Sequence, residues 1–157
     1  GLSQRLHIGR AEAKKIIEDY FANFPAISAY IEDTLASARE FGYVETLFGR
    51  RRYLPDINSK NGTVRALAER TAINAPIQGT SADIIKLAMI NVQKRISEEG
   101  LKSRMILQIH DELLFDTLPE EVERLKEIVC YEMQNVIELS IPLTVDCNYG
   151  NNWLEAH

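Results

Sequence analysis

Apolar residues in the first part of the chain recur at steps of three and four residues, the spacing of one face of an α-helix. One such series starts at Arg10 and ends before Pro25, and a second continues from Pro25 to Gly42. Proline suits the first turn of a helix and glycine its end, so two consecutive amphipathic helices are predicted. Their apolar faces are assigned to the core: Ala13, Ile16, Ile17, Tyr20, Phe21, Phe24, Ile27, Tyr30, Ile31, Leu35 and Ala38.

Shorter apolar runs follow, and turn residues bound them. Tyr43–Phe48 and Tyr53–Pro55 are expected to form a hairpin around a Gly-Arg turn. The polar segment Asp56–Gly62 is the expected boundary between two lobes.

Helical spacing returns at Thr63–Asn74. Pro76 is expected to break that helix, because proline lacks an N–H and clashes with the preceding turn. A new helix is predicted from Gln78 to about Glu99, with Thr80 or Ser81 as its N-cap.

The most distinctive stretch is Met105–Thr117, in which two short apolar runs flank His110, Asp111 and Glu112. The runs predict two buried strands, and the polar triplet predicts the tip that joins them. Carboxylates at the edge of a sheet are open to a cation or a phosphate. Asp and Glu are also ordinary turn residues, so a plain solvated turn is the alternative.

The remaining pattern completes the fold prediction. Pro119–Leu139 is predicted as a helix with acidic first turns, and Ile141–Tyr149 as a last strand. Helices and a hairpin thus precede a helix–hairpin–helix–strand order. This order predicts an α+β fold with a small, mostly antiparallel sheet.

Composition narrows the class of protein. The chain has 157 residues, 45% of them hydrophobic, which suffices for a core. No run approaches the length of a membrane span, and the N-terminus lacks the order of a signal peptide. Cys130 and Cys147 have no metal-type spacing, so a reduced, cytoplasmic protein is expected.

The formal net charge of −5 is unevenly distributed. Residues 1–80 hold 11 basic and 9 acidic side chains, whereas residues 81–157 hold 7 and 14. Local charge decides where a polyanion docks, and Arg50, Arg51 and Arg52 form the densest basic spot. Phosphate contact and a merely soluble turn are both compatible with this cluster.

Arg70, Asn74 and Gln78 follow one another at four-residue steps. A guanidinium and two amides can donate to the acceptors of a DNA minor groove. The alternative is a helix junction whose polar groups are satisfied internally.

Four segments together resemble the C-terminal part of bacterial family A DNA polymerases. They are GYVETLFGRRRYLPDI (42–57), ERTAINAPIQGTSADIIK (69–86), QIHDELLFD (108–116) and NWLEAH (152–157). The resemblance implies a polymerase right hand, with residues 1–62 at the end of the fingers and residues 63–157 in the palm.

The resemblance also implies site residues. Asp111 is expected to be one of two aspartates that hold the catalytic Mg²⁺ ions, with Glu112 as an accessory carboxylate. His110 is expected at the primer end. The primer–template contacts implied by the resemblance are Arg70, Asn74 and Gln78 in the minor groove, and Lys60 and Arg65 in the neighbouring basic stretch.

The activity implied is primer extension from deoxynucleoside triphosphates with Mg²⁺, in DNA replication and repair. The family's other metal-binding aspartate motif and its nucleotide-binding helix do not occur in these residues, and Gly1–Gly9 looks like a cut inside a larger domain. The chain alone is therefore expected to be inactive. Its uncovered apolar surfaces are expected to cause self-association.

Two other functions are open at this stage. A metal-dependent phosphodiesterase using Asp111 and Glu112 needs further ligands, and the other histidines, His7 and His157, lie near the termini. A non-catalytic DNA-binding or interaction module would retain the fold without the chemistry.

Overall fold

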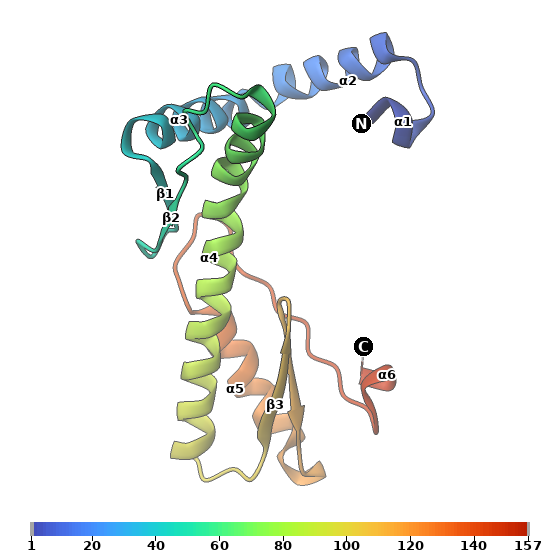
Figure 1. Ribbon diagram of the computed structural model, residues 1–157. Coiled ribbons are helices and arrows are strands. Elements are labelled where there is room, and N and C mark those ends of the chain that lie inside the picture. The colour runs from blue at the N-terminus through green and yellow to red at the C-terminus, as the bar shows by residue number, and fades with distance from the viewer. Residues whose placement is uncertain (1, 157) are drawn as a thin grey trace. The chain divides into compact units, whose positions relative to one another are not determined.

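The computed structural model describes residues 2–156. It divides between Ile77 and Gln78 into two compact units. The long helix α4 (Gly62–Glu98) supplies its first turns to the first unit and its remaining turns to the second (Figure 1).

The first unit contains the predicted pair of helices and the predicted hairpin. Its elements are α1 (Leu2–Leu6), α2 (Arg10–Asn23), α3 (Pro25–Phe41), β1 (Tyr43–Glu45) and β2 (Arg51–Tyr53). Pro25 occupies the first turn of α3. Gly42 ends α3 with a φ of 75°, a left-handed conformation that only glycine adopts without strain.

A small core joins α3, β1, the segment after β2 and the first turns of α4: Ala38, Val44, Leu54, Ile57, Ala68 and Ala72. The loop between β2 and α4 takes part in it, because Ile57 is only 2% exposed. Asn61 then caps α4, since its Oδ1 accepts the backbone N–H of Thr63 at 3.0 Å. The geometric division of the chain thus lies beyond residue 62, and the assignment of residues 1–62 to fingers stays a prediction.

The predicted core face of α2 is largely exposed, so that part of the prediction is wrong. Ala13 is buried, but Ile16, Ile17, Tyr20 and Phe24 are 43–52% exposed. Helical periodicity shows which face is apolar, not whether a neighbour covers it. Here α1 and α3 contact α2 without covering this face.

The predicted helix break at Pro76 is also wrong, because Pro76 lies inside α4. A proline removes one backbone hydrogen bond, that to the residue four positions earlier. The turns on both sides continue the helix. Thr80 and Ser81, predicted as N-caps, are therefore interior residues of α4.

The second unit contains the rest of α4 and five further elements. They are β3 (Arg104–Ile109), β4 (Glu112–Asp116), the 3₁₀ turn η1 (Pro119–Glu121), α5 (Val122–Gln134) and α6 (Trp153–Ala156). The apolar face of α5 packs against α4 through Val92, Ile96, Leu125 and Val129. The predicted helix 119–139 is thus shorter than expected, and it begins as a 3₁₀ turn.

The β3–β4 hairpin is antiparallel, as predicted, but its strands are not buried. Met105 and Phe115 pack on the core, whereas Ile106 is 57% exposed and Leu107 is 45% exposed. The reason is that this sheet has only two strands among the described residues. No further strand or layer there covers Ile106 and Leu107.

No strand forms at Ile141–Tyr149, contrary to the prediction, because this segment pairs with no other strand in the described part of the chain. The structure is α+β and mostly helical, with two separate antiparallel hairpins instead of one palm sheet. Among residues 2–156, no helix is both long and apolar enough to cross a bilayer.

Candidate nucleic-acid and metal site

His110 and Asp111 form the two-residue loop that joins β3 to β4. The last paired residues are Ile109 and Glu112, which face each other across the hairpin. His110 has a φ of 53°, so the first central residue alone is left-handed, the sign pattern of a type II′ turn. Glycine is the usual residue there, and a residue with a Cβ costs about 1–2 kcal/mol more in that conformation. The hairpin tip is therefore strained.

The side chain of Gln108 braces this tip by donating an Nε2 hydrogen bond to the backbone oxygen of His110. Backbone strain that the surrounding contacts hold in place is frequent at functional sites. The sequence analysis did not predict this hydrogen bond. The signal that could have indicated it is a glutamine two residues before the tip.

Asp111 and Glu112 are exposed at the tip and close together in the chain. Hard oxygen ligands of this kind suit Mg²⁺, which is commonly held by one or two carboxylates and by substrate phosphates. No group of three or more His, Cys, Asp or Glu side chains able to hold a metal occurs within residues 2–156. The donor set thus fits a shared Mg²⁺ site and does not form a complete protein cage.

Glu121 fixes the base of the same hairpin. Its carboxylate accepts the backbone N–H groups of Lys102 at 3.0 Å and Ser103 at 2.9 Å, and the Ser103 hydroxyl at 2.6 Å. The Thr117 hydroxyl in turn donates to Ser103 Oγ at 3.1 Å. Ser103 precedes β3 and Thr117 follows β4, so this cluster ties the two strand ends together.

Hydrogen bonds to the ionised form, first from the Lys102 N–H, hold the pKa of Glu121 below its usual value. The carboxylate therefore stays charged at neutral pH. From the sequence, Glu121 had only been assigned to the acidic first turns of a helix.

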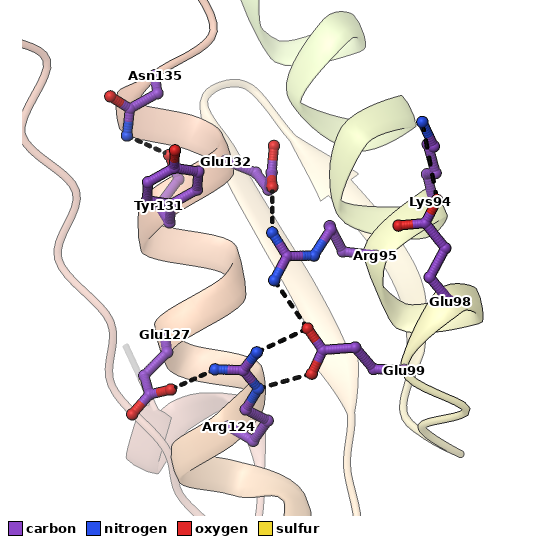
Figure 2. A network of polar contacts seen from close by, with 9 residues as sticks. All are labelled: Lys94, Arg95, Glu98, Glu99, Arg124, Glu127, Tyr131, Glu132 and Asn135. Atoms are coloured by element: carbon purple, nitrogen blue, oxygen red, sulfur yellow. Dashed lines mark hydrogen bonds and ion pairs between the residues drawn. The ribbon is translucent and has the colours of Figure 1, made fainter.

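A network of ion pairs holds α5 against α4 in the second unit (Figure 2). Arg124 Nε and Nη2 bind the two oxygens of Glu99 at 2.6 and 2.7 Å. Arg95 bridges Glu99 at 2.8 Å and Glu132 at 3.1 Å. Hydrogen bonds from Arg124 and then Arg95 lower the pKa of Glu99 to about 2. The network joins α4 to α5, the two helices on which Met105 and Phe115 of the hairpin pack.

Arg70, Asn74 and Gln78 are all exposed on α4. Arg70 and Asn74 stand one turn apart in the first unit, and Gln78 opens the second unit's part of the helix. The side chains of Arg70 and Asn74 are thus available to a ligand in the first unit, and that of Gln78 in the second.

Lys60 and Arg65 differ in their surroundings. Lys60 is exposed in the bend before α4. Arg65 Nη1 donates to the backbone oxygen of Ser59 at 3.0 Å, and its Nε lies 3.8 Å from Glu69 Oε1. Arg65 therefore also stabilises the start of α4, a role that the sequence did not indicate.

Cys130 and Cys147 have free thiols and are neighbours in the second unit. Cys130 Sγ and Cys147 Sγ lie 2.8 Å apart. Burial, and next the contact with Cys130, raises the pKa of Cys147 to about 12. Such a thiol stays protonated at neutral pH and is a poor nucleophile and metal ligand.

Comparison with known proteins places these observations in a family context. The model for DNA polymerase family A matches residues 1–155. The DNA polymerase I of Geobacillus stearothermophilus is 51% identical over 156 residues, which are 99% of this chain and 18% of that protein. The DNA polymerase I of Pseudomonas aeruginosa is 50% identical over 157 residues, which are 100% of this chain and 17% of that protein.

A solved structure is similar over nearly the same length. It is described as the POL domain of Pol1 from M. smegmatis in complex with DNA primer-template and dNTP. The similarity has a TM-score of 0.97 at 49% identity, and it covers 99% of this chain and 28% of that one. This chain spans less than a fifth of the length of the curated relatives reported above.

Proposed function

The chain belongs to DNA polymerase family A, and we propose that it forms part of a DNA-directed DNA polymerase of the polymerase I type. Such an enzyme extends a primer along a template in DNA replication and repair. The observation that carries the proposal is the exposed carboxylate of Asp111, held at the braced tip of the β3–β4 hairpin. It stands in a chain about half identical to DNA polymerase I.

Primer extension joins the primer 3′-hydroxyl to the α-phosphate of a deoxynucleoside triphosphate and releases pyrophosphate. When bound, two Mg²⁺ ions activate the hydroxyl and neutralise charge on the leaving group. Asp111 would hold Mg²⁺ through its carboxylate, and Glu112 would be an accessory carboxylate. Because in-line displacement needs a fixed geometry, the brace by Gln108 and the clamp by Glu121 at the hairpin base support the reaction.

Six residues contact the primer–template in this proposal: His110 at the primer end, Arg70, Asn74 and Gln78 in the minor groove, and Lys60 and Arg65 at phosphates. The minor-groove acceptors of all correct base pairs are nearly alike. Guanidinium and amide donors in that groove can therefore sense pair geometry without reading sequence. This property suits an enzyme that copies any template.

The subdomain assignment belongs to the same proposal. Residues 1–62 form the end of the fingers, and residues 63–157 form part of the palm. The enzyme acts in the bacterial cytoplasm on nucleoid DNA. The phosphodiesterase alternative loses support, because no third metal ligand joins Asp111 and Glu112 within residues 2–156.

The first test is binding of a fluorescein-labelled primer–template to the 157-residue chain, followed by fluorescence anisotropy over a series of salt concentrations. We expect weak binding that decreases as salt increases, because phosphate contacts release counterions. Lys60→Ala should reduce the slope of log affinity against log salt by about 0.9, the value for one phosphate contact. Arg70→Ala should weaken binding by a similar factor for primer–templates of different sequence.

Lys14→Ala is the matched control, because Lys14 is an exposed cation of α2 outside the proposed surface. Binding that is independent of salt, or equal losses in Lys14→Ala and Arg70→Ala, would contradict the assigned surface. In primer-extension assays the 157-residue chain alone should show no incorporation, because residues 2–156 hold no group of three metal ligands. Template-dependent incorporation above background would refute that expectation.

A further inference from the structure

One face of the β1–β2 hairpin presents aromatic rings that the core of its unit does not use. The ring centroids of Phe41 and Tyr43 lie 6.3 Å apart, and those of Tyr43 and Tyr53 lie 5.7 Å apart. Phe41 is 58% exposed and Tyr53 is 66% exposed. Val44 points to the opposite face, where it is buried in the core. Phe41, at the end of α3, and the hairpin residues Tyr43 and Tyr53 thus form an aromatic row at the surface. The other face of the hairpin packs on the core through Val44.

An arginine is fixed on this row. The Arg51 guanidinium lies 4.4 Å from the centre of the Tyr43 ring, and its Nε donates to Glu45 Oε1 at 2.6 Å. The hydrogen bond with Glu45 is the main reason that the pKa of Arg51 is raised. Half of the side chain remains exposed, so the cation is held in place and still accessible.

Internal hydrogen bonds hold the turn of the hairpin. Thr46 Oγ1 accepts the backbone N–H groups of Phe48 at 3.3 Å and Arg50 at 3.2 Å. Gly49 has a φ of 78°, which a side chain would strain. Ligand binding here requires little ordering of the backbone, and this favours affinity.

The charge of the hairpin complements a polyanion. Arg50, Arg51 and Arg52 outnumber the one acidic residue of the hairpin, Glu45. Arg51 shares the face of Tyr43 and Tyr53, whereas Arg52 is exposed but pairs with Val44 and so lies on the other face. A surface that combines aromatic faces with cations is typical of sites for single-stranded nucleic acid. In a duplex, by contrast, the base faces are already stacked on one another.

We propose that this hairpin face binds the unpaired, single-stranded template DNA. Bases stack on Tyr53 and Phe41, while Arg51, on the same face as Tyr53, contacts a backbone phosphate. This inference rests on the proposed polymerase function, for which it names a second DNA contact apart from α4 and the β3–β4 tip.

The test is the anisotropy of labelled oligo(dT) with the 157-residue chain and its variants. Tyr53→Ala should weaken binding roughly tenfold, because stacking on one aromatic ring is lost. Tyr53→Phe keeps the ring and should bind like the original chain. Arg51→Ala should lower the salt dependence by about one phosphate.

Tyr20→Ala is the matched control, since Tyr20 is an exposed, ring-paired tyrosine of α2 in the same unit. It should leave oligo(dT) binding unchanged. Equal losses in Tyr20→Ala and Tyr53→Ala, or a full loss in Tyr53→Phe, would overturn the proposal. Circular dichroism checks that each variant folds, and Arg51→Ala provides the second reading if Tyr53→Ala does not fold.

A blunt duplex separates this inference from the function on which it rests. Binding of the duplex without binding of oligo(dT) overturns the hairpin surface and leaves the polymerase assignment intact. Binding of neither at low salt counts against the DNA contacts of both proposals. A gain in affinity from a single-stranded template overhang that Tyr53→Ala abolishes supports the hairpin surface.

Discussion

At the scale of single residues, the β3–β4 tip combines strain with exposed charge. His110 occupies a left-handed position that glycine fills more easily, and Asp111 and Glu112 follow it directly. The Gln108 side chain holds the backbone of this turn. Such contacts keep the turn in one conformation although it is strained, and they therefore keep the carboxylate in one orientation.

His110→Gly should therefore stabilise the chain. Removing the Cβ relieves the left-handed strain, and the greater freedom of glycine in the unfolded chain offsets part of the gain. We expect the free energy of unfolding to increase by about 0.5–1 kcal/mol in urea titrations. Asp111→Gly is the control, because the φ of Asp111 is not positive. A destabilised His110→Gly variant would show that the turn is not strained.

The sequence predicted where the carboxylates lie but not how they are held. The two apolar runs around His110-Asp111-Glu112 predicted the hairpin, and its pairing is confirmed. The positive φ of His110 could not be predicted, because only a few per cent of non-glycine residues adopt one, even though histidine does so more often than most. The contacts of Glu121 with Lys102 and Ser103 were equally hidden, since they join residues 18 and 19 positions apart.

At the scale of elements, the ion pairs between α4 and α5 make stability depend on pH. Glu99 has a pKa of about 2 in the folded chain, below its ordinary value of 4.5. A lowered carboxylate pKa stabilises the fold fully above the ordinary value, and this contribution is lost as pH decreases from about 4.5 to 2.

Glu99→Gln should therefore lower the melting temperature at neutral pH, and the difference from the original chain should narrow between pH 4.5 and 2. Melting followed by circular dichroism measures this. Glu98→Gln is the control, because Glu98 is more exposed and has a single ion pair, with Lys94 at 3.7 Å. A pH-independent difference for Glu99→Gln would show that the network contributes no charge-dependent stability.

The sequence pattern predicted most helices and both hairpins. It failed where neighbouring segments of the chain decide whether a helix continues or a strand forms. Pro76 was expected to end a helix, yet the neighbouring turns of α4 outweigh one missing hydrogen bond. Ile141–Tyr149 has the composition of a strand but no neighbour to pair with among the described residues. A strand depends on another segment, whereas a helix satisfies its own backbone.

At the scale of the whole chain, much apolar surface remains uncovered. Examples are Ile106 and Leu107 on β3 and Ile16, Ile17 and Tyr20 on α2. Exposed apolar side chains on a two-stranded hairpin favour association with other surfaces. The chain alone is therefore expected to self-associate.

Light scattering over a concentration series measures this association. The apparent mass should increase with concentration, and Ile106→Lys should reduce it by placing a charge on the exposed strand. Tyr131→Lys is the control, because Tyr131 is a similarly exposed apolar residue of α5. A clean monomer at high concentration would contradict the expectation.

The net charge of the whole chain and the local charge of one segment lead to different predictions. The overall charge of −5 argues against a DNA-binding protein, but the basic residues gather in residues 50–70, in the first unit. The family was predictable because four motifs occur in one order along the chain. The complete metal site was not, since the described residues contain no cluster of three ligands.

The central claim is that Asp111 holds the catalytic metal of a DNA polymerase. Its most direct test is steady-state primer extension by the complete enzyme to which we assign this chain, with Asp111→Asn compared with Asp116→Asn at the far end of β4. We predict that Asp111→Asn lowers kcat by more than about 100-fold, since even residues that only support metal ligands contribute roughly 10- to 100-fold. Primer–template affinity should stay nearly unchanged, and Asp116→Asn should remain active. An Asp111→Asn enzyme with the original kcat would contradict the claim.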